Sequence, residues 1–165
     1  MKLLLMRHGI TVEREDWNEA DEPRPLTSEG IQKTRQAAHG LNRIENHVDL
    51  IASSPLRRAI QTRDIVREVF NDADSAMWAE LENAEPESLL RHLRALKIES
   101  VLLVGHEPSL GRFASQLLCG TPDAMAIDFK KAAVCALQVS FEGDTPHATL
   151  LWHAAPKLLR SIASD

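Results

Sequence analysis

Two histidines follow apolar runs of the sequence at nearly the same distance from the end of each run. His8 stands in the segment Arg7-His8-Gly9 directly after residues 2–6, and His106 follows residues 101–104 after one glycine. Apolar runs of this length that end in loops are typical of buried parallel strands. In an open α/β sheet, ligands bind where the carboxyl ends of such strands meet. We therefore expect the two imidazoles on one rim of a sheet, although they lie far apart along the chain.

A third apolar run, residues 50–53, ends before further groups suited to phosphate. Ser53 and Ser54 offer hydroxyl donors at its end, and Arg57 and Arg58 follow at the expected start of a helix. Arginine suits phosphate because its planar fork donates two hydrogen bonds and stays charged in a protein site. A serine before a proline at the start of a helix is more often a helix cap. The two serines could therefore be phosphate donors or caps. Each signal is weak alone, and together they predict a phosphate site.

The elements that would position these groups alternate between strand-like and helix-like stretches. Strands are expected at residues 2–6, 50–53, near 77–78 and at 100–104, and helices from Thr27 to about Leu41, after Pro55, at 88–96 and from Ser109. Thr27, Ser28 and Ser109 are candidate helix caps. Two more strand-like stretches, 132–141 and 149–153, flank Gly143-Asp144 and predict an antiparallel hairpin at one edge. The pattern is that of the α/β class.

Length and composition narrow the class of protein. The 165 residues suffice for one domain with a sizeable core. The 19 basic and 24 acidic residues leave a net charge of −5, which argues against the broad basic surface of a general nucleic-acid binder. Hydrophobic residues make up 44% and charged residues 26%, which excludes disordered and collagen-like chains. We expect a single globular domain with no nucleic-acid partner.

The first residues and the cysteines bear on location and metals. The apolar stretch before Arg7 is too short for a signal peptide or a membrane span, so no membrane partner is expected. Cys119 and Cys135 lack the spacing of a zinc site or a disulfide framework. They are expected to be two reduced, buried thiols in a cytoplasmic protein.

Four segments resemble the histidine phosphatase superfamily, also called phosphoglycerate-mutase-like, and follow its order. Its Arg-His-Gly signature stands as Arg7-His8-Gly9, its Pro-Leu-Thr-x-x-Gly segment as Pro25 to Gly30, its Ser-Pro-x-x-Arg-Ala-x-Gln-Thr segment as Ser54 to Thr62, and its Gly-His as Gly105-His106. The short chain and the segments Arg24-Pro25-Leu26-Thr27 and Ser54-Pro55 look most like those of the bacterial phosphohistidine phosphatases. The resemblance implies one histidine phosphatase domain over residues 1–165, folded as a three-layer α/β/α sandwich on a mostly parallel sheet with an antiparallel edge.

The resemblance also implies roles for individual residues. His8 would be the nucleophile that carries the phosphoryl group, Arg7 and Arg58 would hold the phosphoryl oxygens, and His106 would stabilise the charge in transfer. The motif places its arginine directly before Ala59, so Arg57 is expected on the surface. No cofactor or metal is implied.

Other residues are weaker candidates. The superfamily's proton donor often comes from the region of Glu80 to Glu87, and Glu80 is the best match, although Trp78-Ala79-Glu80 lacks the leucine of the usual Leu-x-Glu. Otherwise this acidic segment is a solvated loop. Thr11 could line the pocket. The remaining histidines match no motif and are expected on the surface: His39, His47, His92, His147 and His153.

Four functions are weighed from these residues. The leading hypothesis is a metal-independent phosphatase that acts on phosphohistidine in proteins. The alternatives are a phosphomonoesterase or mutase for a small phosphorylated metabolite, and a regulatory module that binds phosphate without turnover. Only the short stretch 80–87 could build a substrate pocket after the third strand, which favours a protein substrate. A dinuclear metal hydrolase is disfavoured because no Asp-rich cluster accompanies His8 and His106.

Overall fold

The central sheet is mostly parallel. The computed structural model describes residues 1–83, 85–143 and 145–164, and over these ranges six strands form one sheet in the order β3-β2-β4-β1-β5-β6. The strands are β1 (Lys2–Arg7), β2 (Leu50–Ser53), β3 (Asp74–Met77), β4 (Ser100–Gly105), β5 (Val134–Ser140) and β6 (His147–Ala154). The pairs among β1 to β4 are parallel, whereas β5 runs antiparallel to both β1 and β6. The predicted parallel sheet with an antiparallel edge is confirmed.

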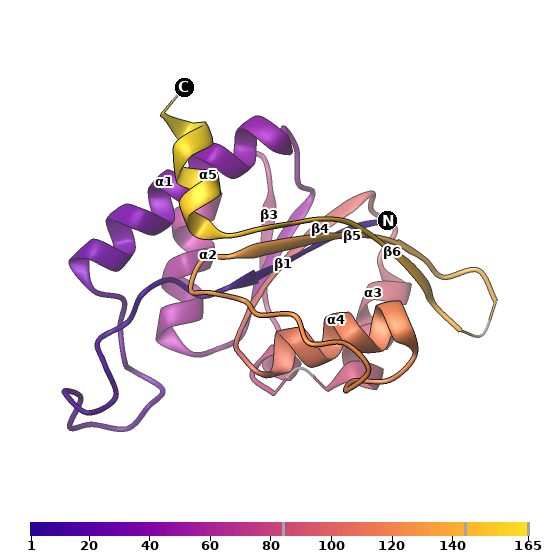
Figure 1. The fold of residues 1–165 in the computed structure, drawn as a ribbon, viewed down its shortest axis with the longest axis horizontal. Coiled ribbons are helices and arrows are strands. Elements are labelled where there is room, and N and C mark those ends of the chain that lie inside the picture. Colours follow the sequence, from indigo (N-terminus) through magenta and orange to yellow (C-terminus); the bar gives the residue numbers. More distant parts are fainter. Residues whose placement is uncertain (84, 144, 165) are drawn as a thin grey trace.

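Helices cover both faces of this sheet (Figure 1). They are α1 (Ser28–Ile44), α2 (Arg57–Val69), α3 (Pro86–Ala95), α4 (Ser109–Cys119) and α5 (Pro156–Ala163), with a short 3-10 helix η1 (Ala79–Leu81). Alternate residues of β1 feed two separate cores: Leu4 packs with α1, α2 and α5, and Leu3 packs with α3 and α4. This alternation follows from the two-residue period of a strand. The three-layer α/β/α sandwich is therefore confirmed.

Several local expectations are confirmed and others are corrected. Thr27 does cap α1, since its hydroxyl accepts the Gly30 amide at 2.9 Å. Ser109 does not cap α4, because it is already the first helical residue and no side chain of the preceding Pro108 can bond an amide. Ser54 is not a cap either, since α2 begins after Leu56 without a side-chain cap.

The remaining differences lie away from the parallel strands. The expectation of a solvated loop at Glu80 to Glu87 is wrong in part, since η1 and the start of α3 occupy it and Leu81, the last residue of η1, is buried. The expectation of two buried thiols is wrong for Cys119, which is exposed at the end of α4. In the predicted hairpin turn, Gly143 has a φ of +82°, and Asp144 lies outside the described residues. No helix in the described part of the chain is long and apolar enough to cross a membrane.

Candidate active site

The carboxyl ends of β1, β2 and β4 bring the two histidines together. Arg7 of β1 lies opposite Gly105 of β4. The backbone amide of the next residue, His8, donates a hydrogen bond to the Gly105 carbonyl at 3.1 Å. The His8 and His106 rings then lie with their centroids 5.1 Å apart and their planes inclined at 48°. The convergence expected from equal spacing after parallel strands is present.

His8 is held as a neutral imidazole with one free nitrogen. Its Nδ1 lies 2.8 Å from the Gly9 carbonyl oxygen, which can only accept, so Nδ1 carries the proton and Nε2 the lone pair. Burial, followed by the charge of His106 and of the two nearby arginines, lowers the pKa of His8 to about 2. A histidine in this state is a nucleophile across the neutral pH range.

Residues of the segments Ser54 to Thr62 and Pro25 to Gly30 fix the position of the loop that carries His8. The Gly9 amide donates to Thr62 Oγ1 at 3.0 Å, and that hydroxyl donates to the Arg58 carbonyl at 2.7 Å. The Thr62 side chain therefore ties the His8 loop to the first turn of α2. On the other side, a Cβ at Gly30 would lie 2.0 Å from the Ile10 carbonyl oxygen, so only glycine allows α1 to pack this closely against the loop.

Arg58 is buried and anchored, whereas its neighbour Arg57 is exposed. Arg58 Nη1 donates to the Asp21 carbonyl at 2.9 Å, and Nη2 donates to Asp21 Oδ2 at 2.8 Å. Arg57 donates only a long bond of 3.4 Å to the Pro23 carbonyl. The expected surface position of Arg57 is therefore confirmed, and Arg58 is the buried member of the pair; that Arg58 holds the phosphoryl oxygens stays a prediction.

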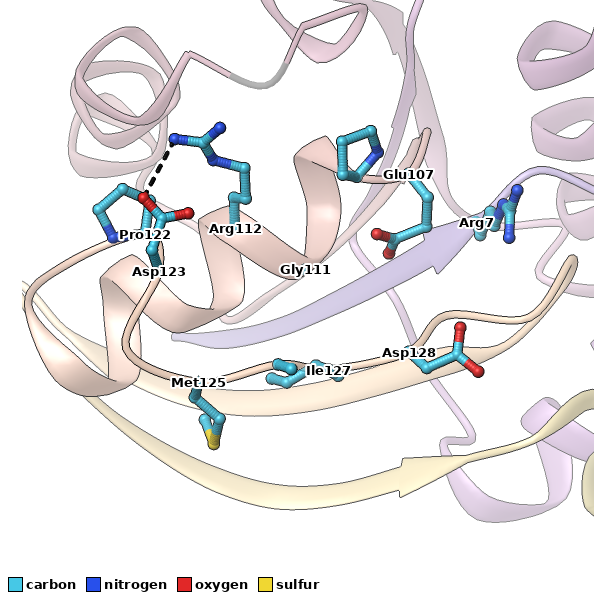
Figure 2. A pocket seen from close by; sticks show the side chains of 11 residues that line it. Arg7, Glu107, Gly111, Arg112, Pro122, Asp123, Met125, Ile127 and Asp128 are labelled. Atoms are coloured by element: carbon cyan, nitrogen blue, oxygen red, sulfur yellow. Dashed lines mark hydrogen bonds and ion pairs between the residues drawn. The ribbon is translucent and has the colours of Figure 1, made fainter.

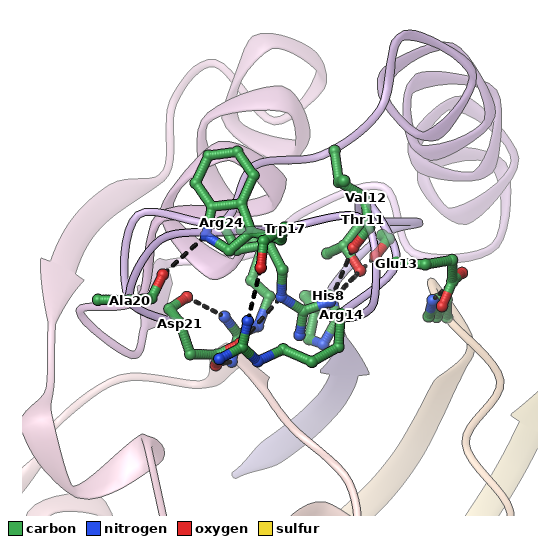
Figure 3. Close-up of polar contacts among 12 residues, drawn as sticks. His8, Thr11, Val12, Glu13, Arg14, Trp17, Ala20, Asp21 and Arg24 are labelled. Carbon is green, nitrogen blue, oxygen red and sulfur yellow. Dashed lines mark hydrogen bonds and ion pairs between the residues drawn. The ribbon is translucent and has the colours of Figure 1, made fainter.

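Asp21 is a residue that the sequence did not single out. It lies in the irregular segment between β1 and α1 (Figure 3), and besides Arg58 it accepts a hydrogen bond from Arg24 Nε at 2.9 Å. Burial opposes its ionisation, but the charge of Arg58 and the hydrogen bonds from the two arginines outweigh it, so the pKa of Asp21 is lowered. No period or motif points to a residue in such a segment, so a carboxylate near Arg58 could only be found in three dimensions.

The same segment is fixed by further polar contacts (Figure 3). Arg24 Nη1 donates to Thr11 Oγ1 at 3.0 Å and to the Val12 carbonyl at 2.8 Å. Trp17 Nε1 donates to the Ala20 carbonyl at 2.7 Å. Thr11 is buried, and its hydroxyl is engaged by Arg24. The segment that carries Asp21 is therefore organised around Arg24.

His106 is positioned by Ser54. The Ser54 hydroxyl and His106 Nε2 are 2.6 Å apart, and both residues are buried. Of the two interpretations of Ser54, the structure supports a place in the site. Burial, and then the charge of Arg58, lowers the pKa of His106 to about 4. Its Nδ1 and the hydroxyl of Ser53 are buried and have no hydrogen-bond partner among the described residues.

Arg7 reaches the site from the end of β1 and borders a cavity of about 440 Å³ (Figure 2). Its Nη1 donates to the Phe129 carbonyl at 2.7 Å. Glu107, on the wall of the same cavity, feels the opposing effects of burial, which raises its pKa, and of the Arg7 charge, which lowers it; burial is the larger. The cavity is mixed in character, since Ile127 and Asp128 also line it.

Glu80, the expected proton donor, does not contact the histidine pair. It lies on η1, and its Oε1 is 3.6 Å from His92 Nδ1. Trp78 stacks on the His92 ring with ring centroids 4.9 Å apart. Within the described residues, Glu80 makes no hydrogen bond or ion pair with His8, Arg58 or His106. Its role as the acid stays a prediction.

The other sequence expectations concern metals and the remaining histidines. In the part of the chain that the structure describes, no three His, Cys, Asp or Glu side chains are grouped so that they could share a metal ion. The five histidines outside the motifs are exposed, although His153 packs edge-on against Phe129, with ring centroids 5.2 Å apart.

Sequence comparison identifies relatives of the whole chain. The family model of the histidine phosphatase superfamily (branch 1) matches residues 3–89. The phosphohistidine phosphatase SixA of Escherichia coli (strain K12) is 29% identical over 161 residues, which cover 94% of this chain and 94% of that protein. An uncharacterized protein of Picosynechococcus sp. is 31% identical over 153 residues, 84% of this chain and 85% of the relative.

Solved structures share the fold. The protein histidine phosphatase SixA complexed with tungstate superposes with a TM-score of 0.83 at 26% identity, over 96% of this chain and 99% of the other. The alpha-ribazole phosphatase from Shigella flexneri gives a TM-score of 0.72 at 20% identity, covering 94% and 97%. A mycobacterial glucosyl-3-phosphoglycerate phosphatase gives 0.71 at 18%, covering 93% and 99%. These last two likenesses concern the fold alone.

Proposed function

Because this chain belongs to the histidine phosphatase superfamily, we propose that it is a metal-independent phosphatase whose His8 carries the phosphoryl group and whose substrate is phosphohistidine in a protein. The observation that supports the first part is the state of His8, a buried neutral imidazole with its Nδ1 proton fixed on the Gly9 carbonyl. A module that only binds phosphate has no need of an imidazole fixed in this tautomer.

The proposed reaction has two displacements at phosphorus. In the first, the lone pair of His8 Nε2 attacks, the bond from phosphorus to His8 forms, and the bond to the leaving group breaks with its electron pair. In the second, water attacks the phosphoryl group on His8 and the bond from phosphorus to Nε2 breaks, with its electron pair returning to Nε2. Orthophosphate leaves, the proton lost by the water passes to the solvent, and His8 is neutral again. Arg7 and Arg58 hold the phosphoryl oxygens, and His106 stabilises the charge that gathers on them.

The choice of substrate rests on the leaving group. An alkoxide leaves from a phosphate ester only with a well-placed general acid. Histidine leaves as an imidazole with a pKa of about 6.5, so it can be protonated on its distal nitrogen near neutral pH without help from the enzyme. Within the described residues no carboxyl group makes a hydrogen bond to His8, and Glu80 is paired with His92. Such a site is better matched to a P–N bond.

A small phosphorylated metabolite is the second candidate. The cavity beside Arg7, with a volume of about 440 Å³, is large enough for the remainder of such a molecule. Against it stands the short segment after β3, where only η1 and a turn precede α3. We rank the protein substrate first because the carboxylates of the cavity, Glu107, Asp123 and Asp128, outnumber its two arginines, Arg7 and Arg112. Arg112 lies 3.5 Å from Asp123, so the lining offers little positive charge for a second anionic group of a metabolite.

A substrate panel tests the proposal. We expect higher kcat/KM for a phosphohistidine protein than for phosphoserine peptide, phosphotyrosine peptide or sugar phosphates. Glu80→Gln should lower hydrolysis of alkyl phosphates more than hydrolysis of phosphohistidine. Reaction stopped in denaturant should leave a phosphoryl group on the chain that is stable to alkali and labile to acid, and His8→Ala should abolish it. A higher kcat/KM for phosphoserine or a sugar phosphate would favour the small-molecule candidate instead.

Metal independence has its own test. Two arginines supply the positive charge and His8 supplies the nucleophile, so the proposed reaction requires no metal-bound hydroxide. Activity should survive exhaustive chelation, and orthovanadate should inhibit by imitating the five-coordinate phosphorus. Loss of activity on chelation, with recovery when a divalent ion is added, would overturn this mechanism.

A further inference from the structure

A second cavity adjoins Arg7 and is lined by cations. Its volume is about 380 Å³, and its charged lining residues besides Arg7 are Lys33 of α1, Lys130 and Lys131 before β5, and Arg160 of α5. The other lining residues are uncharged. We call this the cationic cavity. It gathers positive side chains from four separate parts of a chain whose net charge is −5.

The carboxylates nearby neutralise this cavity only in part. Lys33 forms an ion pair with Glu29, one turn earlier on α1, and Lys131 lies 3.4 Å from Glu13. Both carboxylates are more than half exposed, with side-chain exposures of 63% and 68%, and ion pairs of this kind are weak and easily exchanged. The surface therefore keeps an excess of positive charge.

Lys130 and Arg160 are the less neutralised members of the set. Lys130 is exposed, and no ion pair with it is found among the described residues. Arg160 is half-buried, and its charge acts at longer range on Glu29, lowering the pKa of that carboxyl after the larger effects of Lys33. Long side chains with their charges in water suit a partner's flexible surface carboxylates.

The cationic cavity lies directly beside the proposed reaction site. Arg7 belongs to both, and Ile10, two residues beyond His8, lines the cavity. Ala132, another lining residue, donates its amide to the carbonyls of Arg7 and His8 at 3.1 Å each. In Figure 1, α5 begins next to the start of β5 and packs along α1, so the cavity is formed where these elements meet. A protein that presents a phosphohistidine to His8 would extend over it.

We propose that the cationic cavity docks an acidic segment of the phosphoprotein substrate beside its phosphohistidine. This inference rests on the proposed function and adds the charge of the partner to it. Carboxylates are the complementary groups, and attraction of this type increases the rate of encounter and falls with ionic strength. Because the contact is made before and during the chemical step alike, it should act on KM more than on kcat.

Two synthetic peptides and matched variants test the docking. One peptide carries a chemically phosphorylated histidine flanked by four glutamates, and the other has serines in their place. The wild type should hydrolyse the acidic peptide with kcat/KM on the order of tenfold higher, mainly through KM, at low salt. The variant Lys130→Gln/Arg160→Gln should lose most of this preference, and 0.5 M salt should do the same to the wild type. Hydrolysis of phosphoimidazole should be unchanged in the variant.

The control removes the same amount of charge elsewhere. Arg91→Gln/Lys97→Gln changes two exposed cations in and after α3 and should keep the preference for the acidic peptide. Equal hydrolysis of the two peptides by the wild type, or an equal loss in the control, would overturn the docking and leave the proposed function standing. If neither peptide is hydrolysed while sugar phosphates are, the proposed function fails and the docking fails with it. Altered inhibition by free phosphate with no effect on peptide preference would show a small-anion site instead.

Discussion

Single substitutions can separate the roles of the neighbouring residues Arg58 and Arg57. Its buried guanidinium faces the site and is held by Asp21, whereas Arg57 lies outside. Removal of a charged donor to the transition state usually costs on the order of a hundredfold in rate. We expect this loss for Arg58→Ala and only a small change for Arg57→Ala, measured as kcat on a phosphohistidine substrate. Equal losses at the two positions would mean that the wrong arginine has been assigned.

Asp21 shares the guanidinium that the phosphoryl group is expected to use. Its Oδ2 lies 2.8 Å from Arg58 Nη2, so a bound phosphate would share Arg58 with a carboxylate whose lowered pKa keeps it ionised. Like charges this close repel each other. We therefore expect Asp21→Asn, which retains the side-chain carbonyl oxygen, to bind phosphate and orthovanadate several-fold more tightly.

The inhibition constants of phosphate and orthovanadate measure the effect of Asp21→Asn on anion binding. Glu19→Gln, at an exposed position of the same segment, removes an equal charge and should leave both inhibition constants unchanged. Weaker binding in Asp21→Asn would contradict the prediction, and it would show that the carboxylate's hold on Arg58 matters more than its repulsion of the anion.

At the scale of elements, the packing of α5 on α1 depends on one glycine. A Cβ at Gly40 would lie 1.8 Å from the Leu159 carbonyl oxygen. Ala is favoured over Gly in a helix by about 1 kcal/mol, so Gly40→Ala would stabilise an isolated α1. In the folded chain the methyl group must push α5 away, and overpacking of this kind costs about 1–3 kcal/mol.

The sign of the change in melting temperature decides between these effects. We expect Gly40→Ala to lower Tm by up to about 8 °C in calorimetry, because overpacking less the helix gain leaves a net cost of up to about 2 kcal/mol, and 1 kcal/mol corresponds to about 2–4 °C in a domain of this size. Gln36→Ala, at an exposed position of α1, is the matched control and should leave Tm nearly unchanged. An unchanged or higher Tm for Gly40→Ala would show that α5 moves away without cost.

The elements differ in how well the sequence predicts them, and the reasons are physical. β1 and β4 are buried on both faces, so continuous apolar runs mark them and fix where His8 and His106 stand. The helix α5 was not predicted, because it has only eight residues and its stability comes from contacts with α1 rather than from its own periodicity. Pro156 at its first turn is a start signal that could have indicated it.

The residues of the candidate site also differ in how well the sequence predicts them. Its residues on strand ends and in the helix α2 follow from motif and periodicity, whereas Asp21 and the contact of Ser54 with His106 depend on a loop path and on side-chain packing. Glu80 shows the converse case, since a motif assigned it and the structure pairs it with His92. Position along the sequence indicates which loops meet, and it does not determine which side chains within them touch.

At the scale of the whole molecule, the neutral histidine pair links the site to stability. Burial is the main cause that lowers the pKa of His8 to about 2 and of His106 to about 4. In the unfolded chain both take their ordinary value near 6.5. Between pH 4 and 6.5 the unfolded chain therefore binds more protons than the folded protein, so the free energy of unfolding rises with pH across this window.

This linkage predicts a measurable loss of stability on mild acidification. As pH falls from 6.5 to 4, each of the two histidines should add a slope of up to about 1.4 kcal/mol per pH unit to the decline in the free energy of unfolding. Below that window Asp49 acts in the same direction. Its hydrogen bond with His47 is the main cause that lowers the pKa of Asp49 to about 2. The contribution of Asp49 to the free energy of unfolding is therefore lost as pH falls toward 2. Urea unfolding at half-unit steps should show the decline in the wild type and a shallower one in His8→Asn/His106→Asn. A double variant whose slope between pH 4 and 6.5 equals that of the wild type would mean that the folded protein accommodates charged imidazoles at this rim, and the neutral nucleophile would lose its physical basis.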